Sequence, residues 1–211
     1  MKTKQRILNT CLTLFNEEGE QHVSAVDIAN ELDISPGNLY YHFKGKEPII
    51  ETLFDEFESR YSELLSSASE IDISTESSWK FLYILLEEIY QFRFFYENVH
   101  NILERIPTLK KRFARLLNIQ RSTMELVLLT LLDQEVVIMR PDDIATTAQS
   151  LSLTLTHWLS HNALSNSKKQ REILLNTGAY QMVNAVGAFL APSHRAVFDE
   201  ARELLKQSLL H

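Results

Sequence analysis

Helix-breaking residues are scarce in this chain, and their scarcity limits the folds that it can adopt. Only five glycines and five prolines are spread over 211 residues, which leaves room for long uninterrupted helices. Apolar residues recur at helical spacing, as at Ile7, Cys11 and Phe15, whereas strand-like alternation is limited to a short fragment at 136–139. Hydrophobic residues make up 45% of the chain, which is typical of a globular core. The sequence therefore predicts an all-α globular protein.

The helical pattern divides the chain into a small head and a larger body. Three short helices are predicted at about 2–18, 25–32 and 36–43, followed by a linking helix from about 46 to 65. A stretch rich in Ser, Thr and acidic residues at 66–78 is the best candidate for a boundary. Further helical patterns cover about 76–97, 98–105, 108–133, 142–164, 167–190 and 193–209. We therefore expect a domain at 1–48, continuing into its linking helix to about 65, and a helical domain at 66–211.

Residues 24–43 carry the pattern of a helix-turn-helix, two short helices that cross steeply around a tight turn. Ser24 followed by Asp27 forms a capping-box pattern, and Ser35 followed by a proline marks the start of the second helix. The inward positions hold Ala29 where the helices touch, and then Ile34, Leu39 and Phe43. The outward face of the second helix then presents side chains that can bond to base edges or phosphates, namely Ser35, Asn38, Tyr40, Tyr41 and His42. Gly37 costs a short helix about 1 kcal/mol relative to alanine; it either eases the turn or allows close approach to DNA.

The segment ISPGNLYYHFKGKEPII resembles the end of the DNA-binding domain in the TetR family of bacterial regulators. The matching features are the Tyr-x-His-Phe box at 40–43 and the turn Lys44-Gly45-Lys46 that opens the next helix. Upstream, Phe15 and Gly19 match the Phe-x-x-x-Gly end of the family's first helix. The resemblance covers residues 3–55, and the body is similar only in its helical architecture. The subgroup that it most resembles is associated with acyl-chain or polyhydroxyalkanoate metabolism.

The resemblance implies roles for individual residues. Tyr40 and Tyr41 would contact phosphates or thymine methyl groups, and Asn38 and His42 would lie at or near the groove. Lys46 would contact phosphate, as would Ser24 and Ala25 through the N-terminus of their helix. The full DNA-contacting set implied is Ser24, Ala25, Ser35, Pro36, Gly37, Asn38, Tyr40, Tyr41, His42, Lys44 and Lys46. The sequence departs from many members at Pro36-Gly37-Asn38, which leaves the base preference open.

Aromatic residues crowd the stretch from 79 to 100. Eight aromatic positions within 18 residues are too many for one apolar face of a continuous helix. The resemblance implies that some of them border a cavity for a small apolar effector such as an acyl chain; a plain aromatic core with an interface is an equal alternative. The expected pocket residues are Trp79, Tyr83, Tyr90, Phe94, His100, His157 and Trp158.

The helices predicted at 142–164 and 167–190 suggest a dimer interface. The second is rich in small residues, which let helices approach closely: Gly178, Ala179, Ala185, Gly187 and Ala188. The two helices would supply half of a four-helix bundle about a two-fold axis, as expected of a homodimer on a palindromic double-stranded DNA operator. The alternative is that they pack within one chain.

Charge and motifs limit the other function classes. The net charge is −7, and the first 50 residues carry five Lys and Arg against seven Asp and Glu, so composition does not favour nucleic acid. A helical small-molecule carrier or partner-binding protein whose head does not bind DNA is therefore the alternative function. No catalytic or nucleotide-binding motif is present, so neither an enzyme nor a cofactor is expected. His157 and His161 have a metal-compatible spacing but no evident third ligand.

The compartment is predicted from cysteine usage and from apolar stretches. Cys11 is the single cysteine, so no internal disulfide can form, which fits a reducing cytoplasm. No secretory signal pattern is visible at the N-terminus, and no apolar stretch is long enough to span a bilayer. We therefore expect a cytoplasmic protein with no membrane partner.

Overall fold

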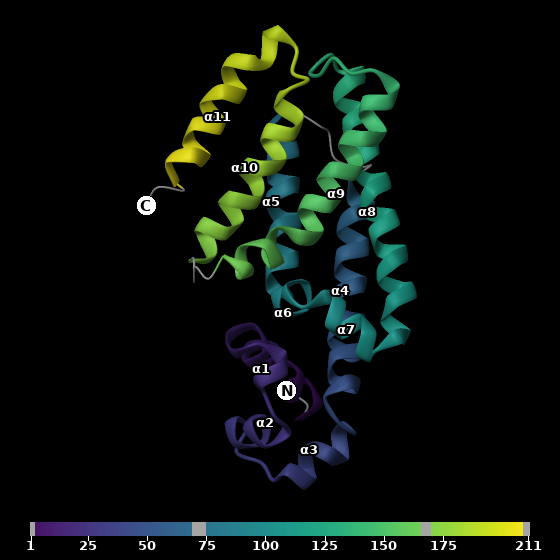
Figure 1. Ribbon diagram of the computed structural model, residues 1–211, viewed down its shortest axis with the longest axis vertical. Helices are drawn as coiled ribbons and strands as arrows, with labels where there is room; N and C mark the ends of the chain where they lie inside the picture. The colour runs from purple at the N-terminus through teal and green to yellow at the C-terminus, as the bar shows by residue number, and fades with distance from the viewer. Residues whose placement is uncertain (1–2, 69–74, 166–169, 209–211) are drawn as a thin grey trace.

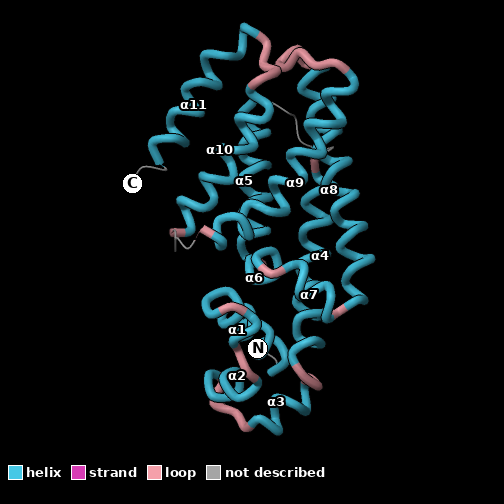
Figure 2. Tube along the Cα trace, in the orientation of Figure 1, coloured by secondary structure: helices cyan, strands magenta, loops and turns pink. Residues whose placement is uncertain are grey.

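The computed structural model describes residues 3–68, 75–165 and 170–208, and within these ranges the chain consists of helices joined by turns and loops (Figures 1 and 2). The helices are α1 Thr3–Glu18, α2 Ala25–Glu31, α3 Pro36–His42, α4 Lys46–Ser67, α5 Thr75–Gln91, α6 Arg93–Glu97, α7 Val99–Arg105, α8 Pro107–Asp133, α9 Pro141–Leu164, α10 Arg171–Gly187 and α11 Arg195–Ser208, with short 3-10 turns η1 Glu20–His22 and η2 Pro192–His194. The fragment at 136–139 contributes only an isolated bridge between Val137 and Leu190. The all-α prediction is confirmed. Among the described helices, none combines the length and apolarity that crossing a bilayer requires.

Helices α1, α2 and α3 form a head at one end of the molecule, and α4 runs from it into the body (Figure 1). The predicted inward face of α1 is confirmed, because Ile7, Cys11 and Phe15 are fully buried. Burial raises the pKa of the Cys11 thiol to about 12, so the side chain stays protonated and packs as a small apolar group.

The prediction of a single helix at 76–97 is wrong, because the helix is interrupted at Phe92, between α5 and α6. The break turns Phe92, Phe95 and Tyr96 into the body, where all three are buried. The ring of Phe57 on α4 stacks on Phe92 with centroids 4.7 Å apart, and on Tyr61 at 5.2 Å. The crowded aromatics therefore form a shared core cluster, because a broken helix can direct more of its residues inward than a continuous one.

A buried polar layer connects α4, α8 and α9. The hydroxyl of Tyr61 donates to Oε1 of Gln120 at 2.7 Å, and Nε2 of Gln120 donates to Oγ of Ser152 at 2.8 Å and to its backbone carbonyl at 3.1 Å. Burial raises the pKa of Tyr61 well above its ordinary value. Because these hydrogen bonds are directional and lie in a low-dielectric interior, this layer sets the register of the three helices.

The two glycines of α10, Gly178 and Gly187, serve packing within the chain. A Cβ on Gly178 would lie 2.9 Å from Leu86 and 3.2 Å from Trp158, and a Cβ on Gly187 would lie 2.5 Å from the ring of Phe198. These contacts bring α10 against α5, α9 and α11. The expectation that Gly178 and Gly187 mark a dimer surface is therefore wrong, because their close approach is already used inside the monomer.

Replacing Gly187 with alanine is expected to lower the free energy of unfolding by about 1–3 kcal/mol, because the new methyl group overlaps the Phe198 ring. Urea denaturation followed by circular dichroism measures the change. Gly37→Ala is the control, since the nearest atom to its added Cβ lies 3.9 Å away. In a Phe198→Ala background Gly187→Ala should cost clearly less; an equal cost in both backgrounds would contradict the overlap.

Candidate functional site

The outward face of α3 is exposed as predicted. Tyr41 is 79% exposed and Tyr40 59%, whereas Leu39 and Phe43 are buried at the positions expected to face inward. Ser35, Pro36, Gly37 and Asn38 are also exposed, and His42 is half-buried. Among the inward residues Ala29 is fully buried, and Ile34 is half-buried against the core. The helix-turn-helix therefore holds a polar and aromatic surface outward on a closely packed base.

Both predicted helix caps are present. The hydroxyl of Ser35 accepts a hydrogen bond from the Asn38 backbone N–H at 3.2 Å. At the start of α2, Oγ of Ser24 accepts from the Asp27 backbone N–H at 3.2 Å, while the Asp27 carboxylate accepts from the Ser24 backbone N–H at 2.8 Å. The hydrogen bonds from the Ser24 side chain and backbone hold the pKa of Asp27 below its ordinary value. Ser24 is expected to contact phosphate through the N-terminus of α2, but its own backbone N–H is already bonded to a carboxylate. Ala25 beside it is exposed.

The two lysines after α3 differ in their surroundings. Lys44 is exposed, with Nζ 4.4 Å from the centroid of the Tyr40 ring. Lys46 at the start of α4 points into the protein: Nζ donates to the Glu20 carbonyl at 2.7 Å and lies 3.3 Å from Oε1 of Glu20. Lys44 is therefore free to meet a phosphate, whereas the ammonium group of Lys46, expected to contact phosphate, is held by Glu20.

Glu20 links the head to the body. Its side chain is fully buried, and its Oε2 accepts a hydrogen bond from Arg105 of α7 at 2.8 Å. Together with Lys46 this gives the buried carboxylate one cation from α4 and one from α7. Sequence reasoning missed this residue, because nothing distinguishes its buried carboxylate from those of the exposed Glu17 and Glu18 just before it.

Asn16 makes a second polar link between head and body. Its Nδ2 donates to the Gln91 carbonyl at the end of α5 at 2.9 Å, and its Oδ1 accepts from the Phe94 backbone N–H in α6 at 3.1 Å. One side chain on α1 thus hydrogen-bonds to a backbone group on each side of the break between α5 and α6. The head is therefore attached to the body by α4 and also by directional polar contacts to α5, α6 and α7.

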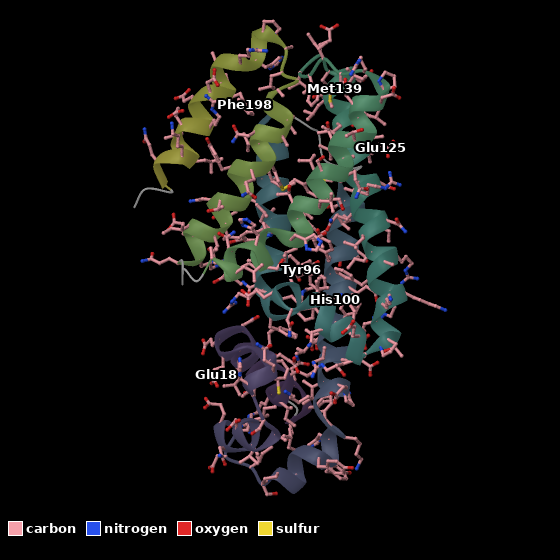
Figure 3. All side chains as sticks on the ribbon, in the orientation of Figure 1. Glu18, Tyr96, His100, Glu125, Met139 and Phe198 are labelled. Atoms are coloured by element: carbon pink, nitrogen blue, oxygen red, sulfur yellow. The ribbon has the colours of Figure 1, made fainter. Side chains whose placement is uncertain are left out.

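The body contains a cavity of about 110 Å³ between α5, α8, α9, α10 and α11. Every residue that lines it is apolar, including Leu85, Met124, Leu151, Met182 and Phe198. Figure 3 labels Phe198 where α11 faces α10. On α5, α8 and α10 the lining residues recur at helical spacing, so in the sequence they cannot be distinguished from ordinary core positions.

None of the expected pocket residues whose side chains are described lines this cavity. Phe94 packs against Phe15, with ring centroids 5.3 Å apart, and Trp158 is buried against Gly178. Tyr83 and Tyr90 are half-buried, and His157 is exposed on α9. His100 is exposed, pairs with Glu104 at 3.2 Å, and lies at the head end of the body, far from Phe198 (Figure 3). The side chain of Trp79 lies outside the described residues.

Comparison with known proteins assigns the chain to a family. Residues 7–53 match the model described as "Bacterial regulatory proteins, tetR family", and residues 56–198 match "Bacterial transcriptional repressor". The chain belongs to the TetR family. A TetR-family transcriptional regulator from Marinobacter aquaeolei VT8 superposes with a TM-score of 0.88 at 28% identity, covering 97% of this chain and 99% of that one.

Two curated relatives match part of this TetR-family chain. The "Probable HTH-type transcriptional regulator YttP" of Bacillus subtilis is 30% identical over 115 residues, which is 54% of this chain and 55% of that protein. The "HTH-type transcriptional regulator UidR" of Escherichia coli K12 is 33% identical over 79 residues, 36% of this chain and 40% of that protein. The matched segments thus span about half the length of these relatives.

Proposed function

We propose that this protein is a ligand-responsive transcription regulator that binds operator DNA as a homodimer and represses until a small apolar effector releases it. The observation that carries the proposal is the helix-turn-helix head of a TetR-family chain with Asn38, Tyr40 and Tyr41 exposed on α3. Exposed amide, hydroxyl and aromatic groups on a second helix of this motif suit contacts in the major groove.

The dimer proposal rests on the outward faces of α9 and α10. Residues 144–164 and 173–194 contain no Asp, Glu, Lys or Arg, in a chain that is 23% charged. Leu153 and Leu164 on α9 are nevertheless 50% and 85% exposed. Depletion of charge in both segments, together with the exposed apolar side chains of α9, is typical of an interface core, and α9 and α10 would form a four-helix bundle with a second copy. A two-fold dimer would place its α3 helices ~34–36 Å apart, one turn of DNA.

The effector proposal rests on the cavity. Because its lining is wholly apolar, a charged group inside it would lose its hydration without gaining a partner. The effector is therefore an apolar molecule, or the apolar part of one, such as an acyl chain. Leu151 lines the cavity on α9, the helix that also carries the proposed dimer face. A ligand that prefers one arrangement of α9 would shift the spacing of the two heads.

A gel shift with the protein's own promoter region tests DNA binding. The full chain should retard a palindromic site, and Tyr41→Ala should weaken retention because it removes the most exposed ring of α3 while leaving the buried core intact. If neither protein binds any palindromic site, the DNA-binding proposal fails and a helical small-molecule carrier is favoured.

Filling the cavity is expected to abolish binding of apolar molecules. Benzene is a suitable probe, because an engineered apolar cavity of about 150 Å³ binds it, and binding to the folded state raises the melting temperature. Val183→Phe, which adds a ring to the cavity lining, should remove this increase and keep DNA binding. Ile84→Phe is the matched control, since Ile84 on α5 is 49% exposed. An undiminished benzene response in Val183→Phe would exclude this cavity as the effector site.

A further inference from the structure

The helix-turn-helix contains no cationic side chain that could read guanine. Residues 7–43 include neither Lys nor Arg, and the commonest specific contact to guanine is a bidentate bond from one of these two residues to O6 and N7. The nearest downstream cations lie after α3 and not on its outward face: Lys44 is exposed, with Nζ over the Tyr40 ring, and Nζ of Lys46 is bonded to Glu20. On the N-terminal side, Nζ of Lys4 lies 5.3 Å from the centroid of the Phe43 ring. Base reading by α2 and α3 themselves therefore falls to neutral side chains.

Asn38 is the residue of α3 best suited to read adenine. It is exposed, and its backbone N–H is already satisfied by the Ser35 cap. Within the part of the chain that the structure describes, its side-chain amide makes no hydrogen bond to the protein. A free carboxamide can donate to N7 and accept from N6 of adenine at the same time, which is the recurring asparagine contact in the major groove.

The exposed large apolar side chains of the head lie on α2 and α3. Among residues 3–45 the exposed large apolar side chains are Val26, Tyr40 and Tyr41, at 53%, 59% and 79% exposure. Val26 lies in the first turn of α2, and the two tyrosines lie on α3, which packs against α2. The Tyr41 ring contacts the His42 ring edge-on at 5.3 Å, and Lys44 lies over the Tyr40 ring. The major groove offers such a surface one apolar partner, the C5 methyl group of thymine.

We propose that the recognition surface of this protein selects A·T base pairs, with Asn38 reading adenine and with Tyr41 and Val26 contacting thymine methyl groups. The inference rests on the proposed function, because it specifies the class of operator that the head would bind. It follows from three observations on the two helices: the absence of Lys and Arg, an amide free to bond, and exposed apolar side chains.

Selection of sites from a random duplex library by the full-length chain tests the proposal and separates it from the proposed function. A parallel selection with Asn38→Ala identifies the base positions whose preference depends on Asn38. Enriched wild-type half-sites with A·T at those positions would support the proposal. Enriched half-sites with G·C at those positions would overturn it while leaving the DNA-binding function intact. No enrichment of any sequence would overturn both. At the Asn38 position we expect wild type to discriminate roughly 5- to 150-fold between base pairs and Asn38→Ala to lose that preference.

Replacing thymine with uracil in a selected site isolates the methyl contacts. Removing one methyl group should weaken binding about fourfold, the worth of one buried carbon. Tyr41→Phe keeps the ring, so uracil should weaken its binding as it does for wild type. Tyr41→Ala should bind equally well to duplexes with thymine or uracil at the base that Tyr41 contacts in wild type. Uracil placed outside the half-sites is the control on the DNA. Equal responses of Tyr41→Phe and Tyr41→Ala at every position would overturn the role of Tyr41.

Discussion

Replacing Glu20 with alanine is expected to lower the free energy of unfolding by about 3 kcal/mol, the low end of the cost of breaking a buried ion pair. The carboxylate is fully buried, while Lys46 and Arg105 keep 21% and 34% of their side chains exposed. These cations regain some water when the carboxylate is removed, which is why the expected cost is not larger. Urea denaturation measures the change.

Glu18→Ala is the matched control for this prediction. Glu18 is exposed at the end of α1, two residues before Glu20 (Figure 3), and an exposed substitution of this kind should change stability by less than about 0.5 kcal/mol. Glu20→Gln separates charge from volume, because it keeps the side chain's size and a carbonyl acceptor. If Glu20→Ala costs no more than Glu18→Ala, the carboxylate does not hold the head to the body.

Replacing Phe57 with alanine is expected to cost about 3–5 kcal/mol, the range for removing a buried phenylalanine ring. Phe57 is fully buried on α4. Its ring stacks on Tyr61 and Phe92 and meets Tyr96 edge-on at 5.7 Å. The substitution would leave a void between α4 and α6 that rigid rings cannot close, so the lost contacts add to the lost burial. Thermal and urea unfolding both measure the loss.

Two further variants grade the Phe57 prediction. Phe57→Leu keeps most of the apolar volume and should cost less than Phe57→Ala. Ile84→Ala removes a large apolar side chain from an exposed position on α5 and should change stability by less than about 0.5 kcal/mol. A Phe57→Ala cost similar to that of Ile84→Ala would show that the aromatic cluster is not the stabilising centre of the body.

The head could be predicted almost residue by residue. The Ser24–Asp27 capping box, the Ser35 cap, and the burial of Ala29, Leu39 and Phe43 all follow from residues within a few positions of one another. Caps and helical faces are local features, because residues three or four apart on a helix share one surface. The exposed face of α3 follows from the same spacing, and its role in binding DNA stays a prediction.

The body could be predicted only as a set of helices. The break at Phe92 has no proline or glycine to mark it in the sequence, and it is satisfied by Asn16, a residue of the head. The pocket residues expected from aromatic crowding do not line the cavity, because the break turns part of that stretch into a solid cluster. The cavity is a space between five helices that their side chains do not fill. Its apolar lining residues cannot be distinguished in the sequence from ordinary core positions.

The sequence by itself determined an all-α chain with a helix-turn-helix head, because helix caps, breakers and apolar spacing act over a few residues. Only the tertiary structure decided that Glu20 is buried, since its partner Arg105 lies 85 residues away. It also decided that Lys46 points inward and that Gly187 receives the Phe198 ring within one chain. These outcomes depend on which distant surfaces meet, and burial changes the chemistry of a charge or a glycine in ways that no local pattern encodes.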